Sequence, residues 1–285
     1  MKRRTFLKKL FSSTLGLLGL GGGTYYYARE IEPGLLAVRK DLIKSPKIAE
    51  TFHNFKIVQF SDTHIGFNYS LEQLSDLVTT INEQNPDMVV FTGDLVDKPN
   101  NYSWGKQLVH ILSSIIAPYG KYWVYGNHDH GGYGTDIVKK TMQDSGFRLL
   151  QNSHSTIKKG NDSFNLIGLD DVLLGKPDIE TALAGIDEKL FSLLLVHEPD
   201  FADQSKTYPI DVQLSGHSHG GQVQIPFFGY IYTPEYAQIY VEGNYQIGER
   251  PLSLFVSRGI GTTRLPYRFL CKPEISVFTL KNTTS

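Results

Sequence analysis

FKIVQFSDTH, residues 55–64, passes from a short apolar run directly into a polar tetrapeptide. The run Phe55–Phe60 has the length and composition of a buried β-strand, and Ser61–His64 follow at its end. The same arrangement occurs twice more: the run Asp87–Phe91 leads to Gly93-Asp94, and Tyr122–Tyr125 leads to GNHD at residues 126–129. These three segments therefore predict strands of one sheet that each end on polar residues.

Helical patterns separate the predicted strands. Ser70 and Gln73 have the spacing of a capping box at a helix N-terminus. Apolar residues then recur on one helical face at Leu71, Leu74, Val78 and Ile81, and a second amphipathic pattern runs over residues 108–116. This βαβαβ order predicts a parallel sheet with helices on its faces.

The second half of the chain is richer in strand patterns. Apolar runs at residues 164–167, 191–196 and 212–214 are followed by strand-like runs at 223–225, 238–241, 253–256 and 275–280. We therefore expect an α/β fold, namely a four-layer α/β/β/α sandwich of two mixed sheets flanked by helices.

Five polar clusters follow predicted strands along the chain. They are Asp62-x-His64, Gly93-Asp94, residues 126–129, His197, and Gly216-His217-x-His219-Gly220. Carboxyl ends of strands in an open α/β sheet converge on one crevice, so these side chains should meet. Carboxylate and imidazole ligands without thiolate suit Mn, Fe or Zn better than Ca or Mg.

Each polar residue also has an ordinary structural explanation when taken alone. Asp62 and Asp94 are compatible with helix caps or turns, Asn127 with a left-handed turn, and any one histidine with a loop position. Five such clusters at successive strand ends favour a metal centre over five unrelated structural roles.

This ordered pattern resembles the calcineurin-like metallophosphoesterase superfamily, whose motifs D-x-H, G-D, G-N-H-D/E, H and G-H-x-H all occur here in order, within about residues 50–280. The resemblance implies two divalent metal ions. Among Mn, Fe and Zn, we expect Mn. It implies that the first is held by Asp62, His64 and His219, and the second by Asn127, His197 and His217, with Asp94 bridging both. Water activated by the metals would attack the phosphoester.

The resemblance also implies a catalytic role for His128, which is not a ligand in the family pattern. His128 would bond to a phosphoryl oxygen or protonate the leaving group, and Asp129 would orient it. His130 is equally compatible with the pocket wall and with the surface. Asp170 and Asp171 fit a solvated turn better than the pocket rim.

The stretch Ser257–Ile275 is the part least explained by metal ligation. The closest likeness of this stretch, and of GNHDHGGYG, LLVHEPD and GHSHGGQ, is to bacterial phosphoesterases exported with a twin-arginine leader. Arg258, Arg264 and Arg268 have the chemistry to hold phosphate through paired hydrogen bonds. Arg258 and Arg264 are as compatible with structural ion pairs as with substrate binding.

The N-terminus carries an export pattern. Lys2, Arg3 and Arg4 precede a glycine-diluted apolar run from Leu10 to Tyr27, which resembles a twin-arginine signal. We therefore divide the chain into a signal or membrane tether outside the fold (1–30), a linker with a first edge strand (31–53) and the catalytic domain (54–282). We expect export through the twin-arginine translocase to the cell wall, the exterior or the outer face of the cytoplasmic membrane, with membrane association possible through the N-terminus.

Composition narrows the range of partners. The chain has 285 residues, 40% hydrophobic and 20% charged, and a formal net charge of -1, so we expect no nucleic-acid partner. The single cysteine, Cys271, excludes an internal disulfide and a cysteine-based zinc site.

Three functions fit the sequence. We expect hydrolysis of a phosphodiester or phosphomonoester, lipid- or cell-wall-linked, at the cell envelope. A second hypothesis is hydrolysis of a lipid-linked diphosphate, as in UDP-2,3-diacylglucosamine pyrophosphatases, although that reaction is cytosolic. A third is a non-catalytic metal-dependent scaffold, which has no need for a histidine such as His128.

Overall fold

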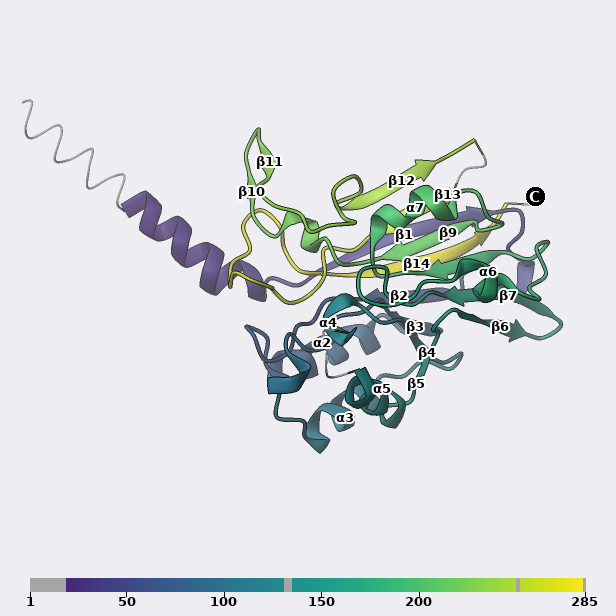
Figure 1. The fold of residues 1–285 in the computed structure, drawn as a ribbon, viewed down its shortest axis with the longest axis horizontal. Coiled ribbons are helices and arrows are strands. Elements are labelled where there is room, and N and C mark those ends of the chain that lie inside the picture. The colour runs from purple at the N-terminus through teal and green to yellow at the C-terminus, as the bar shows by residue number, and fades with distance from the viewer. Residues whose placement is uncertain (1–18, 131–134, 250–251, 284–285) are drawn as a thin grey trace, which may run out of the picture.

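The computed structural model describes residues 19–130, 135–249 and 252–283, which form two six-stranded sheets (Figure 1). The first sheet has the order β1 (Ala37–Ser45), β14 (Glu274–Asn282), β2 (Lys56–Phe60), β3 (Met88–Phe91), β4 (Lys121–Trp123) and β5 (Phe147–Leu149). The second has the order β12 (Gly243–Ile247), β13 (Leu252–Val256), β9 (Val212–Ser215), β8 (Ser192–Leu195), β7 (Asp162–Gly168) and β6 (Ser153–Lys159).

Both sheets are mixed. Strands β2 to β5 are parallel to one another, and so are β7, β8, β9 and β13. Antiparallel neighbours are β14 with β2, β12 with β13, and β6 with β7. The predicted α/β sandwich of two mixed sheets is confirmed.

Helices cover the outer faces of the sheets. Strands β2, β3 and β4 pack against α2 (Leu71–Glu83), α3 (Lys106–Ser113) and α5 (Thr135–Asp144), while β7, β8 and β13 pack against α6 (Ile179–Leu183) and α7 (Ala202–Ser205). A third apolar cluster fills the space between the sheets, with Val90, Leu193 and Phe278 among its buried members. The short helical turns are η1 (Tyr27–Ile31), η2 (Glu32–Gly34), η3 (Glu50–Phe52), η4 (Pro99–Asn101), η5 (Pro199–Phe201) and η6 (His219–Gly221).

The sequence pattern predicts helix α2 correctly, but one strand that it predicts is not formed. The capping box predicted at Ser70 and Gln73 is present, with both of its hydrogen bonds. The strand predicted at residues 238–241 is absent. The backbone N–H groups of Gln238, Ile239 and Tyr240 instead donate to the carboxylate of Asp200, so they take no part in a sheet ladder.

The end of the predicted signal segment contacts the folded domain. Residues 19–26 are helical and continue through η1 into η2. Ala28 O accepts a hydrogen bond from the Arg268 backbone at 2.9 Å, and the buried Glu32 carboxylate accepts from the backbone of Leu270 and Cys271. We expected residues 1–30 to lie outside the fold, but their C-terminal part packs on the loop over residues 264–271.

The basic stretch Lys2–Arg4 and the start of the apolar run lie outside the described residues. No helix within residues 19–130, 135–249 and 252–283 is long and apolar enough to span a bilayer. After η2 the chain enters the first sheet as β1, a strand at its edge that is parallel to β14.

Candidate metal centre

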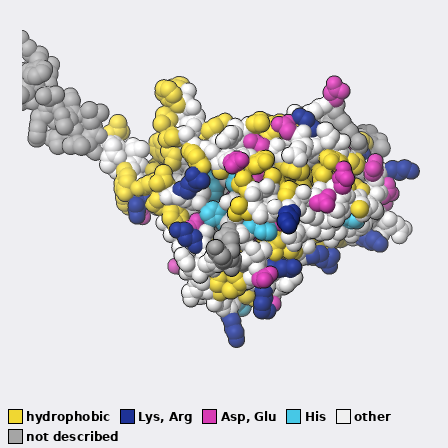
Figure 2. Space-filling model, viewed as in Figure 1, with side chains coloured by type: hydrophobic (Ala, Val, Ile, Leu, Met, Phe, Trp, Pro, Cys, Tyr) yellow, Lys and Arg dark blue, Asp and Glu magenta, His cyan; other side chains and the backbone are white. Residues whose placement is uncertain are grey.

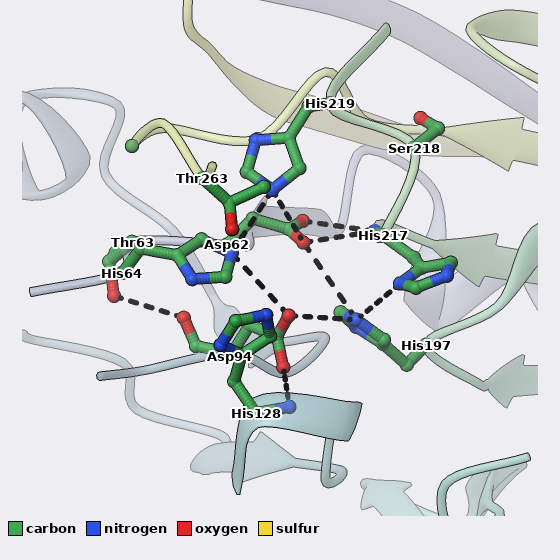
Figure 3. Close-up of polar contacts among 12 residues, drawn as sticks. Asp62, Thr63, His64, Asp94, His128, His197, His217, Ser218, His219 and Thr263 are labelled. Carbon is green, nitrogen blue, oxygen red and sulfur yellow. Dashed lines mark hydrogen bonds and ion pairs between the residues drawn. The ribbon is translucent and has the colours of Figure 1, made fainter. Parts of the chain in front are cut away.

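The polar clusters meet where strands of the two sheets end (Figure 3). Asp62 and His64 follow β2, Asp94 follows β3, and Asn127 begins α4 (Asn127–His130), with three residues between it and the end of β4. His197 follows β8, and His217 and His219 follow β9. All seven predicted metal-binding residues therefore come from strand ends, as the sequence pattern predicts.

The first cluster joins Asp62, His64 and His219. His64 Nε2 lies 3.0 Å from His219 Nε2, and His219 Nε2 lies 3.6 Å from Asp62 Oδ1. All three side chains are buried. Two imidazole nitrogens and a carboxylate oxygen converging in this way form a ligand set for a transition metal.

The second cluster joins Asp94, His197 and His217. His217 Nδ1 lies 3.2 Å from His197 Nε2, which lies 3.3 Å from Asp94 Oδ2. These side chains are buried as well. The second cluster therefore has the same donor chemistry as the first.

One oxygen of Asp94 lies between the two clusters. Asp94 Oδ2 is 3.4 Å from His64 Nε2 on one side and 3.3 Å from His197 Nε2 on the other. Its partner oxygen Oδ1 accepts a hydrogen bond from the His128 backbone at 2.8 Å, which fixes the carboxylate. This is the geometry required of a bridging ligand.

Asn127 shows that the site fits metal ions. Its Oδ1 is buried and has no hydrogen-bond partner among the described residues, and Asn127 lines the same cavity as Asp94 and His217. An unpartnered buried amide oxygen is costly unless something binds it. A metal ion near the second cluster would satisfy this atom.

Hydrogen bonds at the far side of the His197 and His217 rings select the nitrogen that faces the clusters, and a carboxylate faces the far side of His64. His197 Nδ1 donates to Thr92 O at 2.5 Å, and His217 Nε2 donates to Glu235 O at 2.9 Å. His64 Nδ1 lies 3.4 Å from Asp97 Oδ1. Partners of this kind orient metal-binding imidazoles and leave the opposite nitrogen free to coordinate.

The backbone at the site is unusual. Five non-glycine site residues have left-handed φ angles: Asp62 (55°), His64 (43°), Asp94 (64°), His217 (67°) and His219 (51°). Such conformations cost energy and cluster at functional sites. At Gly93 (φ 99°), a Cβ atom would lie 2.6 Å from His197 Nδ1, so glycine is required for the close approach of this ring.

The charges of the cluster are strongly coupled. Burial raises the pKa of Asp62 and the charge of Asp94 raises it further. Burial also raises the pKa of Asp94, but His197 and His128 outweigh this effect and hold it well below the usual range. Burial and neighbouring positive charge lower the pKa values of His217, to about 3, and of His219. Within the described residues neither carboxylate pairs with Lys or Arg, so bound cations would supply the missing positive charge.

His128 lies beside the clusters, but Asp129 does not orient it. Asp129 accepts backbone hydrogen bonds from Asp94, Leu95 and Gly126, so both of its oxygens are used to shape the loops. His128 Nδ1 instead donates to Asp97 O at 2.7 Å, with Asp97 Oδ1 at 3.7 Å. The predicted role of Asp129 is therefore wrong.

Asp97 is a further residue of the site that the sequence motifs do not include. It touches both His64 and His128, and its position three residues after Asp94 was the available signal. These three side chains also form a compact group of potential ligands. His64 already belongs to the first cluster, and His128 binds Asp97. We therefore interpret this group as residues packed around the centre rather than as a third metal site.

The three arginines have different environments. Arg258 Nε pairs with Glu242 at 2.9 Å and with Glu274 at 3.4 Å, so it is a structural ion pair and does not line the cavity. Arg268 is buried, and its guanidinium donates to the carbonyl oxygens of Gly261, Cys271 and Arg258. Arg264 is exposed at the cavity wall, with its guanidinium 4.7 Å from the Tyr232 ring centre. Of the three, only Arg264 is placed to meet a substrate.

His130 and Asp170 form a pair outside the clusters. His130 Nε2 lies 2.6 Å from Asp170 Oδ1, and its ring packs 4.5 Å from that of Tyr125. Asp170 also accepts hydrogen bonds from Gln151 and Lys176, and Asp171 is buried and accepts from the Leu174 backbone. The solvated turn predicted for Asp170 and Asp171 is therefore wrong.

A cavity of about 650 Å³ opens onto the centre. His64, Asp94, Asn127, His128 and His217 form its inner end. The outer wall is mainly apolar and aromatic, with Tyr25, Ile231, Tyr232, Leu265 and Tyr267 among its residues. The centre can therefore receive a ligand whose polar group reaches the clusters while an apolar part contacts the wall.

Known proteins are similar to this chain in sequence. The profile of the calcineurin-like phosphoesterase family matches residues 55–221. A Bacillus subtilis protein named uncharacterized metallophosphoesterase YkuE is 48% identical over 99% of both chains. Phosphodiesterase YaeI of Escherichia coli is 28% identical, covering 98% of this chain and 99% of its own.

Two further likenesses are more distant. UDP-2,3-diacylglucosamine pyrophosphatase LpxG of Chlamydia trachomatis is 28% identical, covering 88% of this chain and 91% of its own. A solved structure of a dimetal phosphatase from Danio rerio is similar at a TM-score of 0.46 and 11% identity, covering 76% of this chain and 94% of that one.

Proposed function

This chain belongs to the calcineurin-like phosphoesterase family and is a metal-dependent phosphoesterase, and from that premise we propose that it uses two metal ions to hydrolyse a phosphodiester or phosphomonoester at the cell envelope. The observation that carries the proposal is the position of Asp94 Oδ2, 3.4 Å from one histidine cluster and 3.3 Å from the other. A shared carboxylate oxygen between two ligand sets supports a dinuclear centre.

The residues divide into two ligand sets and a bridge. Asp62, His64 and His219 would hold one ion, Asn127, His197 and His217 the other, and Asp94 both. Bound there, a pair of divalent ions supplies an activated water and charge neutralisation for the phosphoryl oxygens. The donor set contains nitrogen and oxygen but no sulfur, which favours Mn, Fe or Zn, and we propose Mn.

His128 would act on the substrate from the cavity wall. Its Nδ1–H is held by Asp97 O, which turns the ring and leaves Nε2 available to the ligand. His128 would donate a hydrogen bond to a phosphoryl oxygen or a proton to the leaving oxygen. Arg264, exposed on the same cavity, would contact a second acidic group of the substrate.

Two chromogenic esters test the reaction. The chelated protein is reloaded with Mn, Fe or Zn, its metal content is measured, and it is assayed with bis-p-nitrophenyl phosphate and p-nitrophenyl phosphate. We expect turnover of at least one ester that depends on reloading, and the ratio of the two rates assigns diesterase or monoesterase activity. Protein that carries two metals per chain and cleaves neither ester would favour a scaffold or a more demanding substrate.

A lipid-linked diphosphate is a second candidate substrate. It is supported by the apolar outer wall of the cavity and by the 28% identity to the chlamydial pyrophosphatases. Incubation with UDP-2,3-diacylglucosamine and analysis of the products by mass spectrometry tests it. Release of UMP would support this substrate, whereas cleavage of simple diesters alone would reject it.

We also propose export by the twin-arginine translocase to the cell wall, the exterior or the outer face of the cytoplasmic membrane. The support is the sequence Lys2–Arg4 followed by a glycine-diluted apolar run. Replacing Arg3 and Arg4 by Lys should leave the protein in the cytosol, as measured by fractionation. An unchanged location would reject the proposal.

A further inference from the structure

A projecting hairpin exposes aromatic side chains beside the metal centre. Strands β10 (Gln224–Ile225) and β11 (Gly229–Tyr230) pair antiparallel, and the turn between them carries Phe227 and Phe228. Phe227 is 105% exposed and Phe228 88% exposed. Two adjacent phenylalanines that are almost fully exposed are rare on a protein surface and indicate a contact with something else.

The hairpin belongs to a larger apolar surface. Ile231, Tyr232 and Leu265 are exposed next to it, as are Leu20, Tyr25 and Tyr26 on the N-terminal helix. The helix and the Leu265 loop are joined by the rings of Tyr25 and Tyr267, whose centres are 5.5 Å apart. Figure 2 shows the hairpin as a yellow projection, and Figure 1 shows the helix emerging near its base.

The chemistry of this surface fits a lipid bilayer. Residues 221–234, GQVQIPFFGYIYTP, contain no charged side chain. Phenylalanine stands at the tip and tyrosine behind it, which is the order found at membrane interfaces. The guanidinium of Arg264 lies over the ring of Tyr232, so a positive charge borders the apolar hairpin and would face anionic headgroups.

The chain that precedes the surface supports the same occupant. The N-terminal helix leads back into the apolar run that begins at Leu10. Under the proposed export this run is the segment that reaches the membrane, so it would hold the adjoining surface beside a bilayer rather than a second protein.

We propose that the hairpin over residues 224–232, with Leu265 and the exposed face of residues 20–26, inserts into one leaflet of an anionic membrane. The insertion would place the cavity mouth at the headgroup level, because Tyr25, Ile231, Tyr232 and Leu265 are shared by the apolar surface and the cavity wall. The centre would then act on a lipid-linked phosphoester, a substrate class that rests on the proposed function.

Vesicle binding tests the surface. Full-length, metal-loaded protein is sedimented with vesicles made of equal parts phosphatidylcholine and phosphatidylglycerol. The double variant Phe227→Ser, Phe228→Ser should bind about tenfold or more weakly, since two apolar side chains lose their burial. The matched control is Ile116→Ser, Ile137→Ser, which removes two exposed apolar residues following α3 and within α5. The control should bind like the wild type.

Turnover of bis-p-nitrophenyl phosphate separates this proposal from the proposed function. Phe227 and Phe228 do not line the cavity, so the double variant should cleave this soluble ester at the wild-type rate. Equal vesicle affinity of the hairpin variant and the wild type would overturn the membrane surface. It would also be overturned if wild-type protein ignored vesicles and formed dimers that the hairpin substitutions dissociate.

A fluorescent probe tests insertion directly, even if the serine variant folds poorly. Phe228→Trp keeps an aromatic side chain at the tip. On addition of the same vesicles the emission of this residue, obtained by subtracting the wild-type spectrum with its two native tryptophans, should shift to shorter wavelength and be quenched by brominated lipid. Emission that stays at the wavelength of water-exposed tryptophan in vesicle-bound protein would show that the tip does not enter the bilayer and would overturn the proposal.

Discussion

The two carboxylate oxygens of Asp94 make different contacts. Oδ1 accepts the His128 backbone hydrogen bond, and Oδ2 faces both histidine clusters. Asp94→Ala should therefore lose both metals rather than one and unfold at a lower temperature. Elemental analysis of purified protein measures the first effect and thermal unfolding the second. Retention of a full complement of two metals would contradict the bridging role.

His128 should behave differently from the ligands. His128→Ala should keep both metals, because the bond to Asp94 Oδ1 comes from the backbone and remains. Turnover of a chromogenic ester should fall by about 10²- to 10⁴-fold, the usual contribution of a general acid or base. The metal content of the same sample is the control, and a variant that is purified empty would contradict this division of roles.

Asp97 should tune the metal affinity of the first cluster. Its Oδ1 is 3.4 Å from His64 Nδ1, so the carboxylate charge faces the far side of this metal-binding ring. Asp97→Asn should weaken metal binding by about 10- to 100-fold, as is common when such a partner is changed. Competition with a chelator of known affinity measures the change. The second cluster has no contact with this side chain and should keep its affinity.

At the scale of elements, helix α4 explains what the sequence could and could not reveal. The GNHD motif predicted the position of Asn127 and His128, because both depend on the strand that precedes them. It did not reveal that Asp129 would bind three backbone N–H groups from two loops. Those N–H groups need a side-chain acceptor only once the sheet is assembled. The local residue spacing therefore does not predict that Asp129 binds them.

The strand patterns show the same limit. Buried strands such as β2, β3 and β8 were predictable from their continuous apolar runs. The run at residues 238–241 resembles them in composition. However, the backbone N–H groups of this run donate to Asp200, which lies about forty residues earlier in the chain. Tertiary contacts determine the conformation of such a segment and outweigh its strand propensity.

Helix α4 also makes stability depend on pH through the His130–Asp170 pair. Burial lowers the pKa of His130, but the hydrogen bond and charge of Asp170 outweigh it and raise the pKa. Burial raises the pKa of Asp170, but His130, Lys176 and Gln151 lower it to about 2. The histidine contribution is therefore lost as pH rises through its raised pKa, and the aspartate contribution as pH falls toward about 2.

Asp170→Asn tests this dependence. The variant should lose about 1–3 kcal/mol of unfolding free energy between about pH 4 and 6.5, where both partners are charged in the wild type. The difference should shrink as pH rises through the raised pKa of His130, because the wild-type histidine then becomes neutral. Urea unfolding of both proteins across this range provides the measurement, and a difference independent of pH would contradict the ion pair.

At the scale of the whole molecule, the metal centre lies where the two sheets meet. Asp62 and Asp94 come from the first sheet, whereas His197, His217 and His219 come from the second. Each metal set therefore includes ligands from both sheets, so bound ions would tie the two halves of the fold together. The buried carboxylates would otherwise face each other with only histidines for compensation.

Removal of metal should consequently destabilise the entire domain. Each ion, at a free concentration of about a thousand times its dissociation constant, contributes about 4 kcal/mol to the unfolding free energy, so loss of even one ion corresponds to roughly 5–15 °C in the melting temperature. A chelator should produce this shift in calorimetry of the wild type and should have little effect on Asp94→Ala, which carries no metal to lose. An equal shift in both proteins would mean that the chelator acts elsewhere, and no shift in metal-loaded wild type would mean that the two sheets hold together without the ions.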